Sequence, residues 1–317
     1  MLKRASILFV IISIILIGPY FSFIQSKSIS NSDTIFIEYG TSQNKILNLI
    51  APSNVFNKLF FKIYLRLNKI ETLQAGEYNI KNKPLDIIIK DISNGNTVTH
   101  KFVIKEGSNI YDLKNNIKDS TLINDCKFFN CVNSFFISKE GIFQPDTYYY
   151  KYKSNLSSIL KKSNNALVSY LNEIWKDKHP KNPIKTKEEA LILASIIEKE
   201  AGNNNEKELI ASVFLKRLTI PMRLQADPTI IYGLLPNFDG DIKKSDILDK
   251  NNIYNTYMIN GLPPTPISMV SKSSLKAAII SQPGEYLFFV ANSPTSHYFS
   301  KSYEEHLNMI KELKLDK

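Results

Sequence analysis

The chain has 317 residues and a formal net charge of +10 at pH 7. Hydrophobic residues make up 43% and charged residues 22% of it, which supports folded cores and excludes a globally disordered chain. The length is typical of two domains. A basic chain suits nucleic acid, anionic lipid or an anionic cell wall, or simply has a solvated lysine-rich surface. Since the sequence has no zinc-ligand spacing, phosphate loop or RNA-binding aromatic motif, we expect no nucleic-acid partner.

The sequence has only two cysteines, Cys126 and Cys131. Without further cysteines or a nearby histidine, this pair does not form a metal site, so we expect neither a metal nor a cofactor. Outside the cytoplasm the two thiols could form a local disulfide. The spacing alone does not distinguish that disulfide from two free thiols.

The N-terminal segment predicts the compartment. Lys3 and Arg4 precede an apolar run over residues 5–25, which is long enough to cross a bilayer as a helix. The preceding charges predict a cytoplasmic tail over 1–4 and a periplasmic remainder, as in a single-pass protein of the inner (plasma) membrane. A cleaved signal peptide is the alternative, but residues 26–28 lack the Ala-x-Ala pattern of a cleavage site.

Residues 33–120 predict a small strand-helix-helix-strand module. Strands are expected over 34–39, 76–80 and 100–104, and helices over 44–50, 57–67, 84–93 and 110–117. This order is similar to LysM-like carbohydrate-binding folds. Residues 121–145 have no clear period, and we expect them to connect the module to a second domain.

The second domain is expected over 146–312, which gives the whole chain an α+β fold. Helices are predicted over 156–175 and 206–218, and a hairpin over 286–291 and 297–300 closes the domain. The tyrosines of 148–150 suit either a sugar-stacking platform or an aromatic core edge. His297 and His306 have no metal-ligand spacing, so we interpret both as ordinary structural histidines.

The most informative helix is predicted from residue 187 to residue 201. Thr186 is the expected N-cap, with Glu189 completing a capping box, and Gly202 follows the last turn. Two acids near its end, Glu198 and Glu200, are about 200° apart around the helix axis. Both side chains therefore cannot enter one cleft.

The helical period favours Glu200 as the functional acid. Residues three, four and seven positions away share its face, and these are Ile197, Ile196 and Leu193. A carboxyl against an apolar wall has a raised pKa and can hold a proton for a leaving oxygen near neutral pH. The alternative interpretation is a solvated acid at a helix end. By the same local reasoning, Asp227 before Pro228 is first of all a helix N-cap.

Several sequence blocks follow one another in a specific order. They are SIIEKEA at 195–201, ASVFLKRL at 211–218, MRLQADPTIIYG at 222–233, YNTY at 254–257 and GLPP at 261–264. Together they resemble the MltG (YceG-like) family of endolytic murein transglycosylases. The resemblance is strong over about 140–310 and looser over 33–120, where the family has a LysM-like region.

The resemblance implies an enzyme with helices around a glycan cleft and Glu200 as its catalytic acid and base. It also implies a set of cleft-lining residues: Gln225, Asp227, Thr229, Tyr254, Asn255 and Thr256. The expected reaction cleaves the bond between N-acetylmuramic acid and N-acetylglucosamine and leaves a 1,6-anhydro end.

The expected partners are peptidoglycan glycan strands, together with peptidoglycan synthases and the elongation or division machinery. Cleavage near the membrane would then terminate glycan elongation. Two alternatives stay open at this point. One is a hydrolytic muramidase that uses Glu200 with Asp227, and the other is a membrane-anchored scaffold that binds glycan without cutting it.

Overall fold

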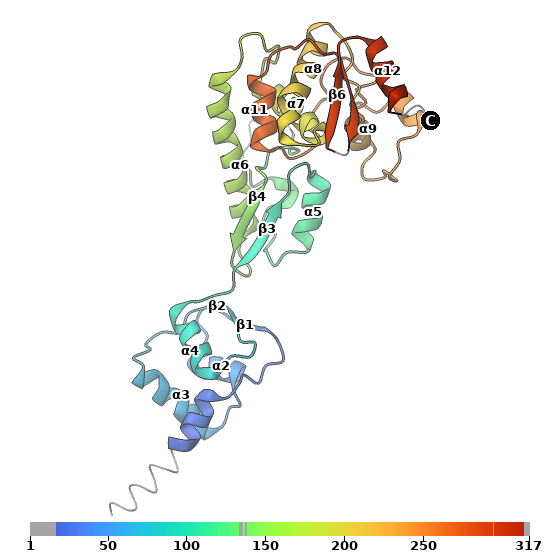
Figure 1. Ribbon diagram of the computed structural model, residues 1–317. Coiled ribbons are helices and arrows are strands. Elements are labelled where there is room, and N and C mark those ends of the chain that lie inside the picture. The colour runs from blue at the N-terminus through green and yellow to red at the C-terminus, as the bar shows by residue number, and fades with distance from the viewer. Residues whose placement is uncertain (1–16, 133–135, 137, 294, 314–317) are drawn as a thin grey trace, which may run out of the picture. The chain divides into compact units, whose positions relative to one another are not determined.

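The computed structural model describes residues 17–132, 136, 138–293 and 295–313 of the chain. It has a mixed α+β fold of helices and small two-stranded sheets (Figure 1). The chain divides into two compact units. The N-terminal unit extends to residue 101 and includes residues 149–154, and the C-terminal unit comprises 102–148 and the chain from residue 155 onward.

The N-terminal unit packs three helices against a short antiparallel sheet. Strand β1 (Thr34–Ile37) pairs with β2 (Gly76–Asn79), with Ile35 opposite Tyr78. The helices are α2 (Gln43–Ile50), α3 (Val55–Leu67) and α4 (Leu85–Asn94). Their apolar faces form one buried core with the sheet. Gly95 ends α4 in the left-handed conformation at φ 69°, which glycine adopts without steric cost.

The transmembrane anchor predicted over 5–25 lies mostly outside the described residues, because these begin at residue 17. No helix within the described part of the chain is long and apolar enough to cross a membrane. Residues 17–25 are helical, and Phe23 and Ile24 are buried in the core of the N-terminal unit. This segment therefore also contributes to the packing of that unit.

The C-terminal unit is built around α7 (Lys187–Glu200). Its residues 190–197 are all buried, because α8, α9 and α11 pack around it. The preceding helices are α5 (Ile110–Lys118) and α6 (Leu156–Ile174). Strands β3 (His100–Ile104) and β4 (Asp146–Tyr150) pair with each other, and each has residues in both units. The elements after α7 are α8 (Lys207–Thr219), α9 (Asp227–Leu234), α10 (Lys244–Leu248), α11 (Lys272–Ile280), β5 (Phe288–Ser293), β6 (Ser296–Ser300) and α12 (Tyr303–Glu312).

The boundary between the units lies at residue 101, whereas the sequence placed it at 120 with a connector over 121–145. The difference arises because the turn before α5 bonds to the C-terminal unit. Gly107 N donates to Met269 O at 2.9 Å, and Met269 N donates to Ser108 O at 2.7 Å. Residues 102–148 therefore pack with the C-terminal unit, while the LysM-like character of the first module stays a prediction.

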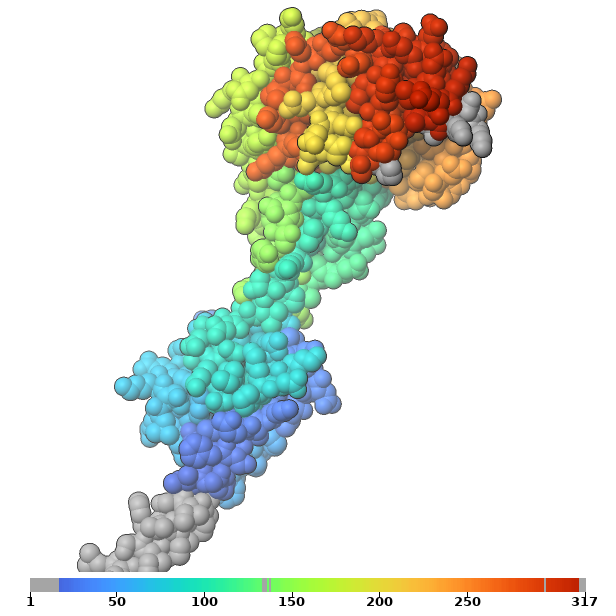
Figure 2. Space-filling view, viewed as in Figure 1, coloured from blue at the N-terminus to red at the C-terminus, as the bar shows by residue number. Residues whose placement is uncertain are grey.

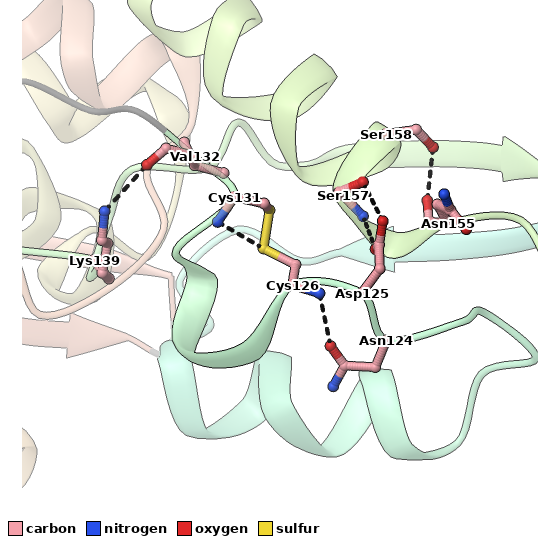
Figure 3. Close-up of a disulfide and its surroundings, with 9 residues drawn as sticks. All are labelled: Asn124, Asp125, Cys126, Cys131, Val132, Lys139, Asn155, Ser157 and Ser158. Atoms are coloured by element: carbon pink, nitrogen blue, oxygen red, sulfur yellow. Dashed lines mark hydrogen bonds between the residues drawn. A yellow bond between two sulfur atoms is a disulfide. The ribbon is translucent and has the colours of Figure 1, made fainter.

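Cys126 and Cys131 form a disulfide, which resolves the choice that the spacing left open (Figure 3). Their Cα atoms are 5.2 Å apart. The adjacent Asp125 accepts hydrogen bonds from Ser157 N at 2.8 Å and Ser157 Oγ at 2.6 Å. The disulfide loop is thereby fixed to the first turn of α6.

Two helix starts differ in detail from the prediction. Thr186 caps α7 by accepting from Glu189 N at 3.1 Å, but Glu189 accepts from Lys185 N rather than completing the capping box. The N-cap of α9 is Ala226, so Asp227 is the first helical residue and its carboxylate is not used as a cap. That carboxylate is therefore available to a cleft.

Candidate active site

The two acids at the end of α7 point to different surroundings, as the helical period predicts. Glu198 faces α8 and the start of α11, where Lys207 and Ser271 contact it. Glu200 faces a cleft formed by α8, the loop before α9 and the β5–β6 hairpin. The residues beneath Glu200 that the period identified, Leu193, Ile196 and Ile197, are fully buried.

Glu198 lies in a closed polar site. Its carboxylate accepts from Ser271 N at 2.9 Å and Ser271 Oγ at 2.5 Å, and Lys207 Nζ lies 3.4 Å away. Burial alone would raise the pKa of Glu198, but these hydrogen bonds and the lysine charge outweigh it and hold the pKa below its usual value. An acid that stays ionised in a closed site is suited to holding helices together rather than to donating a proton.

Glu200 lines an open cleft of about 410 Å³. Withdrawal from water, reinforced by the negative charge of Asp227, raises the pKa of Glu200 to about 8, although Arg217 opposes the shift. The carboxyl group is therefore protonated near neutral pH and accessible from the cleft, as a general acid requires. The lining residues are Glu200, Arg217, Gln225, Asp227, Tyr257, Phe288, Phe289, Val290, Ala291, His297, Tyr303 and His306.

Arg217 is a buried cation at the wall of this cleft that the sequence did not single out. It projects from α8, and its guanidinium donates to Leu224 O at 2.6 Å and to Leu287 O at 2.8 Å. The group also lies over the Phe288 ring, 5.6 Å from the ring centre. These contacts join α8 to the loop before α9 and to the hairpin, and they hold a positive charge near Glu200.

Gln225 and Asp227 line the same cleft as Glu200. Gln225 has a φ of 50°, and its backbone N–H donates to Thr256 O at 3.2 Å. The hydroxyl of Tyr257 donates to Asp227 Oδ1 at 2.7 Å. Burial and the nearby Asp227 raise the pKa of Tyr257, so this phenol stays a donor and fixes the carboxylate.

Thr229, Asn255 and Thr256 lie outside the cleft and are fully buried. Asn255 Nδ2 donates to the carbonyls of residues 246, 247 and 249, while the hydroxyl of Thr229 lies 2.9 Å from that of Thr256. Tyr254 also lies elsewhere, with its hydroxyl 2.8 Å from Thr265 Oγ1. These side chains are saturated by internal hydrogen bonds. They shape the loops around Gln225 and Asp227 and do not line the cleft themselves.

His297 lines the cleft, where Glu206 holds it. Its Nδ1 lies 2.9 Å from Glu206 Oε2, and its backbone N–H donates to Glu206 Oε1 at 2.9 Å. His306 also lines the cleft. No local signal could reveal this, since Glu206 and His297 are 91 positions apart and meet only when the hairpin packs.

The hairpin closely approaches the end of α7. Asn203 Nδ2 donates to Thr295 O, and a Cβ atom at Gly202 would lie 2.8 Å from the Thr295 backbone. Glycine is therefore required at residue 202 for this approach, whereas α7 itself ends at Ala201, which is extended. In Figure 2 the C-terminal segments, coloured red, cover part of one face beside the yellow α7 region.

Glu140 is a second acid with a raised pKa, and it lies outside the cleft. It is almost fully buried, and Oε2 accepts from Ile110 N at 2.9 Å and from the Tyr232 hydroxyl at 3.0 Å. Burial raises the pKa of Glu140 to about 7 against these hydrogen bonds. Because it bridges α5 and α9 in a closed site, its geometry is structural.

The described residues contain no group of three or more His, Cys, Asp or Glu side chains arranged to hold a metal ion. The cleft nevertheless combines a protonated carboxyl, an ionisable carboxylate, a buried cation and aromatic rings. This combination can bind a polar ligand that has apolar faces, such as a sugar chain, and can protonate an oxygen within it.

Comparison with known proteins matches residues 35–312 to the YceG-like family. A protein of Bacillus subtilis (strain 168) named endolytic murein transglycosylase is 30% identical, with 90% of this chain and 86% of that protein covered. A protein of the same name from Streptococcus pneumoniae (strain D39) is 24% identical, with 86% and 57% covered. The crystal structure of a YceG-like protein from Listeria monocytogenes aligns with a TM-score of 0.59 at 30% identity, with 87% and 98% covered.

Proposed function

The chain belongs to the YceG-like family, and from this membership and the cleft we propose that it is an endolytic lytic transglycosylase of peptidoglycan. The substrate is the glycan strand, and the bond cleaved joins N-acetylmuramic acid to N-acetylglucosamine. The observation that carries the proposal is Glu200, a carboxyl with a pKa of about 8 in a cleft open to a ligand.

In the first step, protonated Glu200 donates its proton to the glycosidic oxygen as the bond breaks. The developing positive charge at the sugar carbon is eased by the sugar's own N-acetyl oxygen and by the Asp227 carboxylate in the same cleft. Tyr257 holds that carboxylate by its 2.7 Å hydrogen bond. Gln225, which lines the same cleft, would hydrogen-bond the sugar.

In the second step, ionised Glu200 takes the proton of the muramic acid C6 hydroxyl, whose oxygen attacks C1 of the same sugar. A 1,6-anhydro end forms, and no water is consumed. The attack is intramolecular and gains from proximity, so one carboxyl acting twice suffices. Most glycosidases, by contrast, use two carboxyl groups.

The presence of Asp227 in the cleft also supports a second candidate, a hydrolytic muramidase. In that reaction Asp227 would position a water molecule while Glu200 acts as the acid. The product would then be a reducing end instead of an anhydro end. The end group of the product therefore separates the two reactions.

The test is digestion of purified glycan strands by the native chain, the Glu200→Gln variant and the Glu198→Gln variant. Glu200→Gln should lower the rate by about 10³-fold or more, because an amide cannot donate the proton. Glu198→Gln is the matched control, two positions away in a closed site. The variant protein that folds should cleave the strands at the native rate. Mass spectrometry should find anhydro ends; full activity of Glu200→Gln would overturn the assignment.

We also propose that the apolar run that begins at residue 5 anchors the chain in the inner membrane and ends before Phe23 and Ile24, which pack in the core of the N-terminal unit. The cleft would then lie on the periplasmic side. The enzyme would then act where new strands emerge and end their elongation, in contact with synthases and the elongation or division machinery. Flotation of the native chain with lipid vesicles after reconstitution tests the anchor. A chain that stays in the dense fraction after alkaline washing would contradict it.

A further inference from the structure

Helix α3 in the N-terminal unit has apolar residues on two faces. Phe60, Phe61, Tyr64 and Leu65 are buried in the core of the unit. A second apolar set is exposed: Val55 by 79%, Leu59 by 46%, Ile63 by 37% and Leu67 by 68%. These four residues, here called the exposed stripe, are four positions apart and follow one side of the helix. A contiguous apolar surface of this kind marks an interaction site.

A row of cations runs beside the exposed stripe. Lys58, Lys62 and Arg66 are also four positions apart, and each immediately precedes a member of the stripe. All three are exposed, and α3 contains no acidic residue. The solvent side of the helix is therefore apolar along one edge and uniformly basic along the other. This is the arrangement of helices that lie in the interface of an anionic membrane.

The helical segment of residues 17–25 packs against the buried side of α3. The rings of Tyr20 and Phe23 lie 5.9 Å and 6.0 Å from the ring of Phe60 in α3. A cavity of about 650 Å³ is lined by residues of both segments, including Pro19 and Phe56, and Phe56 is 63% exposed. The 17–25 segment directly follows the most apolar part of the sequence. The exposed stripe therefore lies near the point where an anchored chain would leave the bilayer.

We infer that α3 binds the surface of the anionic bilayer in which the chain is anchored, an inference that rests on the proposed anchor. The exposed stripe enters the acyl boundary, and Lys58, Lys62 and Arg66 contact the phosphate groups of lipids such as phosphatidylglycerol. A second copy of the chain is a poorer partner, because two such surfaces in contact would bring their basic rows together. The contact would hold the N-terminal unit against the membrane.

The test places a tryptophan in the stripe of the full chain. Leu59→Trp is made together with Trp175→Phe, which removes the one native tryptophan. The protein is reconstituted into vesicles of phosphatidylcholine and phosphatidylglycerol that contain brominated lipid. Tyr39→Trp in the same background is the matched control, because Tyr39 is 99% exposed in the same unit but not on α3.

Bromolipid should quench about half or more of the Leu59→Trp emission and little of the control emission, since quenching requires contact with acyl chains. Replacing Lys58, Lys62 and Arg66 by Glu should reduce that quenching severalfold, while circular dichroism shows the fold intact. Equal quenching of the two tryptophans would overturn the inference. So would an emission that is blue-shifted but unquenched, because protein would then cover the stripe. A chain that fails to float with the vesicles overturns the anchor, and this inference with it.

Discussion

The two sides of the last turn of α7 place the same chemical group in opposite states. On one side, Glu198 is enclosed by serine donors and Lys207, and its pKa lies below the usual value. On the other, burial and, to a lesser extent, the charge of Asp227 raise the pKa of Glu200 to about 8. Two positions along one helix thus separate a structural anion from a proton donor. The difference lies in the partners that each face meets and not in the acids themselves.

The largest expected effect comes from removing the cation that stabilises Glu198. Lys207→Met leaves a buried carboxylate without its counter-ion and should lower the free energy of unfolding by about 3 kcal/mol. Chemical unfolding followed by circular dichroism measures this loss. The double variant with Glu198→Leu should recover more than half of it, because no unpaired charge remains. A single variant as stable as the native chain would show that the pair has no structural role.

The next effect is the opposite pH dependence of stability at the two acids. The folded-state pKa of Glu200 is raised, so native stability should fall as pH rises from about 4.5 toward 8. Glu200→Gln removes that cost, so its stability should increasingly exceed that of the native chain as pH rises toward 8, with no gain at pH 4.

Glu198→Gln should behave in the opposite way, because the folded-state pKa of Glu198 is lowered. The variant should be less stable than the native chain above the unfolded-state pKa of Glu198. This difference should vanish as pH falls through the folded-state pKa. Thermal unfolding of both variants over a pH series measures the two trends. Parallel curves would contradict the contrast between the two faces.

A smaller effect concerns the pH profile of cleavage. Activity should decline as pH rises through about 8, because the acid is then ionised. Asp227→Asn removes a negative charge that raises the pKa of Glu200, so the alkaline limb should move to lower pH by about half a unit to one unit. The profile of kcat/KM measures this shift, and Asp241→Asn, at an exposed acid away from the cleft, should leave the limb in place.

The smallest effect separates Glu140 from Glu200, since both have raised pKa values but only Glu200 faces the cleft. Glu140→Gln should flatten the pH dependence of stability between about 4.5 and 7. The alkaline limb of cleavage should stay where it is. A displaced limb would show that Glu140 acts on the reaction through Tyr232.

Periodicity alone predicted most of the secondary structure. Helices α2 to α8 and the β5–β6 hairpin lie within a few residues of their expected positions, because their apolar spacing and their caps are local properties. The capping box at Thr186 and the cap at Asp227 were wrong in detail. Glu189 accepts a hydrogen bond from Lys185 N instead, and the Asp227 carboxylate accepts one from the Tyr257 hydroxyl.

The helical period is enough to show that Glu198 and Glu200 cannot share a cleft and that Glu200 lies on the apolar face, because both follow from 3.6 residues per turn. The residues that cover each face come from distant parts of the chain, so they depend on how the elements pack. Arg217, Tyr257 and His297 reach the cleft from distant segments. Thr229, Asn255 and Thr256 belong to the family's sequence blocks, yet they are buried beneath the cleft loops. A helical period predicts the side of its own helix from which a side chain projects. The residues that contact that side chain depend on how separate elements pack.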